Sequence, residues 1–180
     1  MSTTMSDKKC AYTEWQTPER ILMAVMDYMR IDLDPATSPK NPTRAAAFFT
    51  PKENGLERAW SGNVYVNPPY GGELKKWTRK IYLEAARGVH IVALLPGQRF
   101  ETKYWQHDIL GARGLDAICF ISGRLKFIRA DGNPAGSNPF GSMLYIFNSP
   151  RRAKTVVFAR LGMVLLIREG FLAWPSLLVS

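Results

Sequence analysis

Apolar residues recur every three or four positions in a stretch that begins near residue 19, the spacing of one buried face of an α-helix. Thr17-Pro18-Glu19 precedes this stretch. It is typical of a helix start, because threonine caps helices, proline suits the first helical position and glutamate complements the positive helix end. The apolar positions are Ile21, Leu22, Val25, Met26 and Met29. We therefore expect an amphipathic helix after Pro18.

A second helical pattern extends from Leu74 to Arg87. Apolar and charged positions lie on opposite faces of this stretch, as in an amphipathic helix, and Gly88 is placed to end it. The apolar face contains Leu74, Trp77, Ile81 and Ala85, and the charged positions are Lys75, Lys76, Arg79 and Lys80. We also expect a helix from about Lys103 to Leu110, and Thr43 to Phe49 fits a short helix.

Short apolar runs bounded by turn residues predict the strands. The first is Ile31-Asp32-Leu33-Asp34-Pro35, before a loop rich in Pro, Ser and Asn. Asn63 to Val66 predicts a strand that ends at a double proline, because proline cannot continue a central strand. The other expected strands are Ile91 to Leu95, Leu115 to Ile128 and Ser142 to Phe147. Val156 to Phe158 fits a strand, and Met163 to Ile167 fits a strand or a helix.

This order of elements predicts an α/β fold with a mostly parallel sheet and a C-terminal antiparallel strand pair. Ligands of such sheets bind outside the carboxyl ends of the strands. Asp34-Pro35 and Asn67-Pro68-Pro69-Tyr70 both lie at strand ends. We therefore expect the functional site where these two segments meet.

Chain length, hydrophobic content and net charge limit how many domains the chain can form and which binding partners suit it. The 180 residues, 46% of them hydrophobic, suffice for one core, and we expect a single domain over residues 14–180 after a flexible segment of residues 1–13. The net charge of +9 favours a polyanionic partner such as nucleic acid. No signal peptide or membrane-spanning stretch is expected, because the apolar C-terminal run is short and Arg160 interrupts it.

Cysteine and histidine usage argues against a disulfide framework and against a metal site. Cys10 and Cys119 are the only cysteines, and His90 and His107 are the only histidines. Cys119 lies inside an apolar run, where a free cysteine behaves as a small hydrophobic residue. Too few ligands remain for a zinc site, and a reducing cytoplasm suits the chain.

The segment Asn67-Pro68-Pro69-Tyr70 suits the chemistry of a planar amino group. The lone pair of the adenine amino nitrogen is delocalised into the ring, so the nitrogen must become more tetrahedral before it attacks a methyl sulfonium. Asn67 Oδ1 and the Pro68 carbonyl can accept its two N–H bonds and direct the lone pair. Pro69 stiffens the segment, because its φ is fixed, and this preorganises the carbonyl. Tyr70 can stack on the flat base, which must flip out of a duplex to be reached.

At this motif the sequence resembles the amino methyltransferases marked by Asn/Asp-Pro-Pro-Tyr, and more narrowly the phage and prophage Dam-type DNA adenine methyltransferases. The resemblance extends from about Glu14 to Phe147, most of the chain. The segments that carry it are Glu14-Trp15-Gln16-Thr17-Pro18, Asp32-Leu33-Asp34-Pro35-Ala36, Gly55-Leu56, Trp60, Val64 to Gly71, Leu94-Leu95-Pro96, Gly123 to Phe127, and Pro139-Phe140-Gly141-Ser142.

The resemblance implies a Rossmann-like fold that binds S-adenosylmethionine and methylates the N6 amino group of adenine in double-stranded DNA. Thr17 and Pro18 are then expected at the methionine end of the cofactor, and Asn67 to Tyr70 at the target adenine. Trp15, Asp32, Asp34, Pro35, Ala36 and Asn67 complete the expected cofactor-binding residues. It also implies a phage or prophage enzyme of the bacterial cytoplasm, associated with restriction and modification.

One departure from the family pattern concerns the loop after the first strand. Related enzymes carry a glycine-rich turn there, so that the backbone can approach the cofactor, whereas Ala36-Thr37-Ser38-Pro39 follows here. Asp34 and Asn67 are also too close in sequence for two further strand-helix units, so we expect an abridged sheet. Asp32, Asp34 and Glu53 are all candidates for the acid that binds the ribose, and Asp34 is equally typical of a turn.

Basic residues near the motif are candidates for contacts with DNA phosphates, although a solvated face has the same pattern. The link from Arg129 to Gly141 is the loop expected to contact DNA. The candidate DNA-binding residues are Lys75, Lys76, Arg79, Lys80, Arg99, Arg124, Lys126, Arg129 and Phe140.

Two other functions fit the same residues. The tetrapeptide suits any planar amide or amine, which allows a protein glutamine or RNA amine methyltransferase. A chain without the glycine-rich turn also allows a basic DNA-binding relative that has lost catalysis. The charge and the absence of a familiar RNA-binding motif favour DNA, and the intact Asn67 to Tyr70 favours an enzyme.

Overall fold

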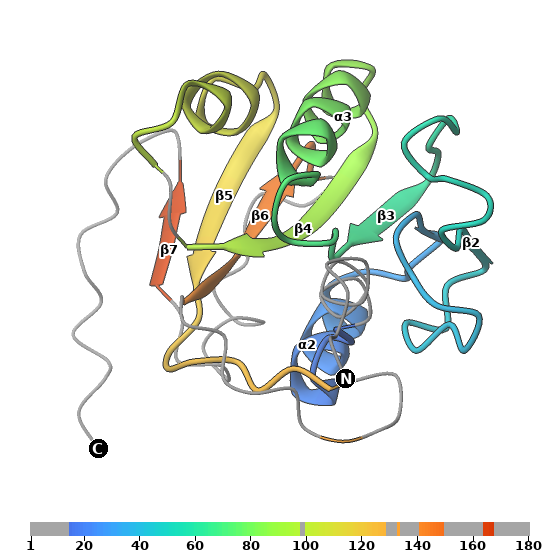
Figure 1. Cartoon of the computed structure of the whole chain (residues 1–180). Coiled ribbons are helices and arrows are strands. Elements are labelled where there is room, and N and C mark those ends of the chain that lie inside the picture. The colour runs from blue at the N-terminus through green and yellow to red at the C-terminus, as the bar shows by residue number, and fades with distance from the viewer. Residues whose placement is uncertain (1–14, 98–99, 129–132, 134–140, 150–163, 168–180) are drawn as a thin grey trace, which may run out of the picture.

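The described residues form a mixed α/β structure around a seven-stranded sheet, as a computed structural model of the chain shows (Figure 1). The structure describes residues 15–97, 100–128, 133, 141–149 and 164–167. The strand order is β2-β1-β3-β4-β6-β5-β7. The strands are β1 (Leu33–Asp34), β2 (Ala47–Phe48), β3 (Asn63–Val66), β4 (His90–Pro96), β5 (Leu115–Phe120), β6 (Ser142–Phe147) and β7 (Val164–Ile167).

Most strands of the sheet point in the same direction. The neighbours β2, β1, β3 and β4 are parallel, and β6 lies antiparallel between β4 and β5, so that β5 points with the first four strands. β7 is antiparallel to β5 at the edge of the sheet. The predicted α/β class, the mainly parallel orientation and the antiparallel C-terminal strands are therefore confirmed.

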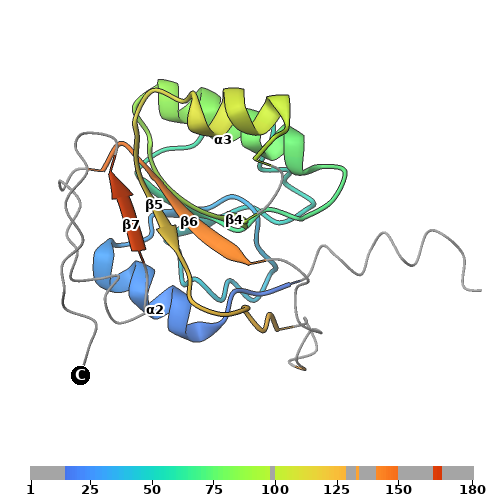
Figure 2. The same cartoon turned by 90° about the vertical axis from the view of Figure 1, so that its left-hand side faces the viewer.

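Helices cover both faces of the sheet (Figure 2). Helix α2 (Glu19–Tyr28) lies on one face, and α3 (Leu74–Ala86) lies on the other together with the π-helix η1 (Trp105–Leu110). Successive residues of the central strands alternate between the two resulting cores, since Tyr65 packs with α2 whereas Val64 and Val66 pack with α3. All seven residues of β4 are buried, as the continuous apolar run predicted.

The strand order reverses direction at β1. The chain proceeds from β1 to its neighbour β2 on one side and then to β3 on the other side, where Leu33 pairs with Val64. Such a switch point leaves a crevice at the carboxyl ends of the two strands, because their connections leave in opposite directions. β1 ends at Asp34 and β3 ends at Val66, so Asp34 and Asn67 flank this crevice.

The predictions for the two long helices are largely confirmed. Helix α3 buries Leu74, Trp77, Ile81 and Ala85, and Gly88, at φ +87°, follows it in the left-handed conformation. Helix α2 begins at Glu19 with Ile21, Leu22 and Val25 buried. The predicted capping role of Thr17 is wrong: Pro18 occupies the capping position, without a side-chain hydrogen bond, and Thr17 Oγ1 bonds to the Tyr65 hydroxyl instead.

Three other elements differ from their predictions. The expected short helix over Thr43 to Phe49 is wrong, because Ala47–Phe48 forms the parallel edge strand β2 beside β1. The predicted strand Leu115 to Ile128 is too long: β5 ends at Phe120, and the chain then turns through Gly123 at φ +74°. Val164–Ile167 is a strand, which resolves the alternative left open for that segment.

Several predictions fall outside the described residues. These are the flexible segment of residues 1–13, the strand at Val156 to Phe158 and most of the link from Arg129 to Gly141. The single domain over residues 14–180 also stays a prediction. Among the described residues, no helix has the length and apolar character needed to cross a membrane.

A close backbone contact holds the loop after β1. Gly55 is buried, and its carbonyl accepts a hydrogen bond of 2.9 Å from the indole Nε1 of Trp60. A Cβ atom added to Gly55 would lie 2.0 Å from the carbonyl oxygen of Pro35. The glycine therefore allows the turn of residues 51–57 to pack directly against the Asp34-Pro35 segment.

We predict that Gly55→Ala destabilises the fold by about 1–3 kcal/mol, because the added methyl group overlaps a backbone atom that has little room to move. Urea unfolding followed by circular dichroism measures the change. Gly72→Ala is the matched control, since a Cβ atom there has no neighbour within 4 Å. Equal stability of the two variants would refute the contact.

Candidate active site

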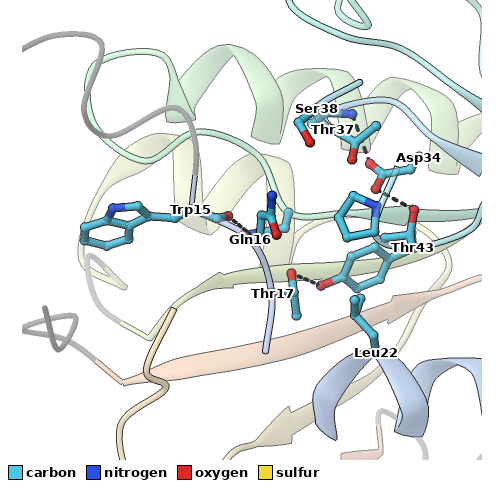
Figure 3. Close-up of a pocket in the computed structure, with 12 residues that line it drawn as sticks. Trp15, Gln16, Thr17, Leu22, Asp34, Thr37, Ser38 and Thr43 are labelled. Carbon is cyan, nitrogen blue, oxygen red and sulfur yellow. Dashed lines mark hydrogen bonds between the residues drawn. The ribbon is translucent and has the colours of Figure 1, made fainter. Parts of the chain in front are cut away.

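Two adjoining pockets lie at the carboxyl ends of β1 and β3. The first encloses about 390 Å³, including open solvent at its mouth, and the second about 290 Å³. The first is lined by Trp15, Gln16, Thr17, Leu22, Asp34, Ala36, Thr37, Ser38, Pro42, Thr43, Tyr65 and Asn67 (Figure 3). The second is lined by Trp15, Ala36, Asn67, Pro68, Pro69, Tyr70 and Phe127. Trp15, Ala36 and Asn67 border both, so the pockets are contiguous.

Asp34 is the only acidic or basic residue that lines the first pocket in the described structure. The residue is 3% exposed, and its carboxylate accepts hydrogen bonds from the backbone N–H of Ala36 at 3.1 Å and from Thr43 Oγ1 at 2.9 Å. Burial raises the pKa of this carboxyl from 3.8 to about 6, and the hydrogen bonds oppose part of that shift. Asp34 therefore orders the turn, which is one of the two roles that its sequence context allowed, and it lines a pocket. Its binding of a ribose stays a prediction.

An N-terminal segment, Trp15 to Thr17, closes the first pocket from the side opposite Asp34 (Figure 3). Its backbone pairs with Ile128 through reciprocal hydrogen bonds of 2.7 and 3.1 Å at Gln16. The Thr17 hydroxyl bonds to the buried hydroxyl of Tyr65 at 2.7 Å. Contacts distant in sequence thus fix a short stretch that has no regular structure of its own.

Asn67 lies between the two pockets, and the N-terminal segment orients its amide. Its Nδ2 donates a hydrogen bond of 3.1 Å to the backbone carbonyl of Trp15. With the amino end of the amide engaged in this way, Oδ1 remains as an acceptor, and no described residue donates to it. The Pro68 carbonyl likewise accepts no hydrogen bond from the described residues, and Pro68 itself lines the second pocket.

Three aromatic rings form a wall of the second pocket. Trp15 and Phe127 stack, with ring centroids 5.5 Å apart, and Tyr70 meets Phe127 edge to face at 6.0 Å. The Tyr70 hydroxyl donates to the Leu94 carbonyl at 3.5 Å, a long hydrogen bond, and burial raises its pKa. A pocket with flat apolar walls, an amide oxygen and a backbone carbonyl is suited to a planar group that carries N–H donors.

The structure assembles most, but not all, of the residues predicted to bind a cofactor. Trp15, Thr17, Asp34, Ala36 and Asn67 line the first pocket. Pro18 and Pro35 do not, and Asp32 instead pairs with Arg30 at 2.6 Å and accepts the backbone N–H of Asn63. Glu53, the third candidate for a ribose-binding acid, is exposed and bonds to Thr50.

Several residues that line the pockets were not among the predicted site residues. The missed residues are Gln16, Leu22, Thr37, Ser38, Pro42, Thr43, Tyr65 and Phe127. Gln16 and Phe127 lie inside segments that carried the resemblance, next to residues that were named. Tyr65 also lies inside such a segment, Val64 to Gly71. Thr43 had no comparable signal, because only the fold brings it beside Asp34.

The basic residues predicted to bind DNA divide into paired and unpaired groups. Lys80 pairs with the buried Glu84 at 2.7 Å, Arg79 with Asp108 at 3.3 Å, and Lys76 with Glu73 at 3.0 Å. Lys75, Arg124 and Lys126 are exposed and form no ion pair with the described acidic residues. Arg99, Arg129 and Phe140 lie outside the described residues. In the described part of the chain, no three potential ligands cluster as a metal site.

The sequence matches the family model described as DNA N-6-adenine-methyltransferase (Dam) over residues 2–166, nearly the whole chain. No curated protein matches the chain. The matched range includes every residue that lines the two pockets.

The burial of Asp34 generates a prediction about stability and pH. Because the pKa of Asp34 is raised in the folded state, the folded protein binds this proton more tightly than the unfolded chain does. The free energy of unfolding of the wild type, compared with that of Asp34→Asn, should therefore fall by about 2 kcal/mol as the pH rises from 4.5 to 7.5. The asparagine in this variant stays neutral and keeps an acceptor oxygen.

Urea unfolding of both proteins at the two pH values measures this difference, and comparing the variants cancels the titration of all other groups. Parallel pH profiles for the two proteins would show that Asp34 is not held in an environment that disfavours its charge.

Proposed function

Because this chain belongs to the DNA N-6-adenine-methyltransferase (Dam) family and so methylates adenine in DNA, we propose that the two pockets hold S-adenosylmethionine and the target base. The first pocket holds the cofactor and the second the adenine. The observation that carries this proposal is the position of Asn67, which borders both pockets with its amide oriented by the Trp15 carbonyl.

The first pocket suits a polar ligand. Within the described structure, the buried atoms Gln16 Nε2 and Ser38 Oγ have no hydrogen-bond partner, and both residues line this pocket. A buried donor or acceptor without a partner costs free energy, which a bound ligand can recover. Asp34, on the far side of the pocket, can accept ribose hydroxyls. When bound, S-adenosylmethionine supplies an electrophilic methyl group on a sulfonium.

Asn67 and Pro68 activate the amino group of adenine. Asn67 Oδ1 and the Pro68 carbonyl accept one N–H bond each, and this draws the nitrogen away from the planar geometry in which its lone pair is delocalised. Positive charge that develops on the nitrogen is stabilised by two fixed dipoles. The proton leaves after methyl transfer, so no strong general base is required. Pro69 adds rigidity, because its φ is fixed.

The aromatic wall holds a base that has left the duplex. Tyr70 supplies a flat apolar surface, and stacking offsets part of the cost of flipping the base. Exposed Lys75, Arg124 and Lys126, with the net charge of +9, support contacts with phosphates. Lys76, Arg79 and Lys80 are weaker candidates, since acidic neighbours already partner them. The family match favours DNA over the RNA, protein or non-catalytic alternatives.

We further propose that the sheet is an abridged Rossmann-like methyltransferase sheet. The switch point between β1 and β3 and the helices on both faces support this proposal. A DNA substrate is consistent with action in the cytoplasm, and a phage or prophage origin with a role in restriction and modification stays a prediction.

The proposed function is tested by incubating the protein with S-adenosylmethionine labelled in its methyl group and, in parallel, duplex DNA, RNA and protein. Label should appear in duplex DNA as N6-methyladenine. Label confined to RNA or protein, or no transfer to any substrate, would overturn the proposal.

We predict that Asn67→Ala lowers the methylation rate at least about 100-fold, as the loss of one preorganised polar contact to a reacting group does in other enzymes. Asn63→Ala is the matched control, because Asn63 begins β3, at the end of the strand opposite to Asn67, and its side chain bonds to His90. The control should keep its activity once any loss of stability, measured by urea unfolding, is taken into account. If Asn67→Ala methylates DNA at close to the wild-type rate, Asn67 does not activate the amino group.

For Tyr70 we predict that the ring matters and the hydroxyl does not. Tyr70→Phe should stay within about threefold of the wild-type rate, because the hydrogen bond from the hydroxyl to the Leu94 carbonyl is long, at 3.5 Å. Tyr70→Ala should lose about ten- to hundredfold, the typical value of one base–aromatic stack. Steady-state kinetics on duplex DNA compares them; equal losses in the two variants would assign the role to the hydroxyl.

A further inference from the structure

The first pocket has one feature that the proposed function leaves open, namely which residue receives the negatively charged end of the cofactor. S-adenosylmethionine carries a carboxylate on its amino-acid group. No lysine or arginine lines the pocket among the described residues. The described part of the pocket therefore offers the carboxylate neutral hydrogen-bond donors. The carboxylate should lie away from Asp34, because two like charges repel at short range.

The Trp15 to Thr17 segment lies across the pocket from Asp34, whereas Thr37, Ser38 and Thr43 lie beside Asp34 (Figure 3). In the Trp15 to Thr17 segment, Thr17 is already bonded to Tyr65. The amide of Gln16 is not engaged in this way: its Nε2 is buried and has no partner within the described structure. Such an N–H donor costs stability in the empty pocket, and a ligand acceptor would remove this cost.

We propose that Gln16 binds the carboxylate of the cofactor's amino-acid group through its side-chain amide. This inference rests on the proposed use of S-adenosylmethionine and adds a residue to the proposed site. Two backbone hydrogen bonds to Ile128 hold Gln16 in place, so the position from which its side chain extends is fixed. A hydrogen bond to a charged acceptor is stronger than one between neutral groups, which suits a pocket whose described lining residues include no lysine or arginine.

The test compares Gln16→Leu with wild type by isothermal titration calorimetry, using S-adenosylhomocysteine and its decarboxylated analogue as probes. Leucine keeps a similar volume and removes the amide. The variant should bind S-adenosylhomocysteine at least about tenfold more weakly than wild type. It should bind the decarboxylated analogue with wild-type affinity, since that probe lacks the group that Gln16 contacts.

A second measurement separates ligand binding from a structural role. Without ligand, Gln16→Leu should be at least as stable as wild type in thermal unfolding, because the substitution removes a buried donor without a partner. Gln106→Leu is the matched control: Gln106 is exposed, donates to the Phe100 carbonyl and lies in η1, away from both pockets. It should leave the affinity for both probes unchanged.

Each other outcome overturns the proposal in a distinct way. Unchanged affinity of Gln16→Leu for S-adenosylhomocysteine, or an equal loss for both probes, refutes the carboxylate contact while the proposed function stands. A variant that is less stable without ligand assigns Gln16 a structural role. Failure of wild type to bind S-adenosylmethionine and S-adenosylhomocysteine, alone and with duplex DNA, refutes the proposed cofactor and this inference together.

Discussion

The site depends on one hydrogen bond between segments far apart in the sequence, from Asn67 Nδ2 to the Trp15 carbonyl. An amide can present either its oxygen or its amino group to a ligand, and this contact determines that the oxygen is presented. The acceptor is a backbone carbonyl of a short segment, which itself is held by Ile128 and by the stack of Trp15 on Phe127. The orientation of the motif is therefore a property of several packed segments, although the motif itself is continuous in sequence.

The topology explains why this contact forms at a pocket. The strand order reverses at β1, and the connections that leave β1 and β3 in opposite directions open a crevice at Asp34 and Asn67. The loop after β1 has no glycine-rich turn. The Asp34 carboxylate orders it instead, by accepting hydrogen bonds from the Ala36 backbone N–H and the Thr43 hydroxyl. The close approach of Gly55 to Pro35 supports the same loop from outside. A glycine from another segment thus provides a close backbone approach to a loop that has no glycine of its own.

Local sequence patterns correctly predicted the elements that have a long periodic or continuous apolar pattern, or that end at residues such as proline. Helix α3 and strands β3 and β4 were placed within one or two residues, because a helical apolar face, a double proline and a fully apolar run each leave few alternatives. Elements that depend on partners were missed. Ala47–Phe48 is a strand only because β1 lies beside it, and Thr17 does not cap α2, since Tyr65 offers its hydroxyl instead. Propensity is a weak signal over two or three residues, and a single tertiary hydrogen bond overrides it.

The sequence by itself determined the α/β class, the position of Asn67 to Tyr70 at the end of a strand and the relation to the amino methyltransferases, because periodicity and a contiguous motif are properties of neighbouring residues. Only the tertiary structure decided that Asp34 rather than Asp32 lines the first pocket, and that Gln16, Tyr65 and Phe127 join it or its neighbour. The two aspartates look alike in the sequence, but the pairing of β1 with its neighbours leaves Asp34 at the carboxyl end, where the crevice opens, and Asp32 beside Asn63. A pocket is a property of distant segments in contact, and the order of residues does not specify which segments those are.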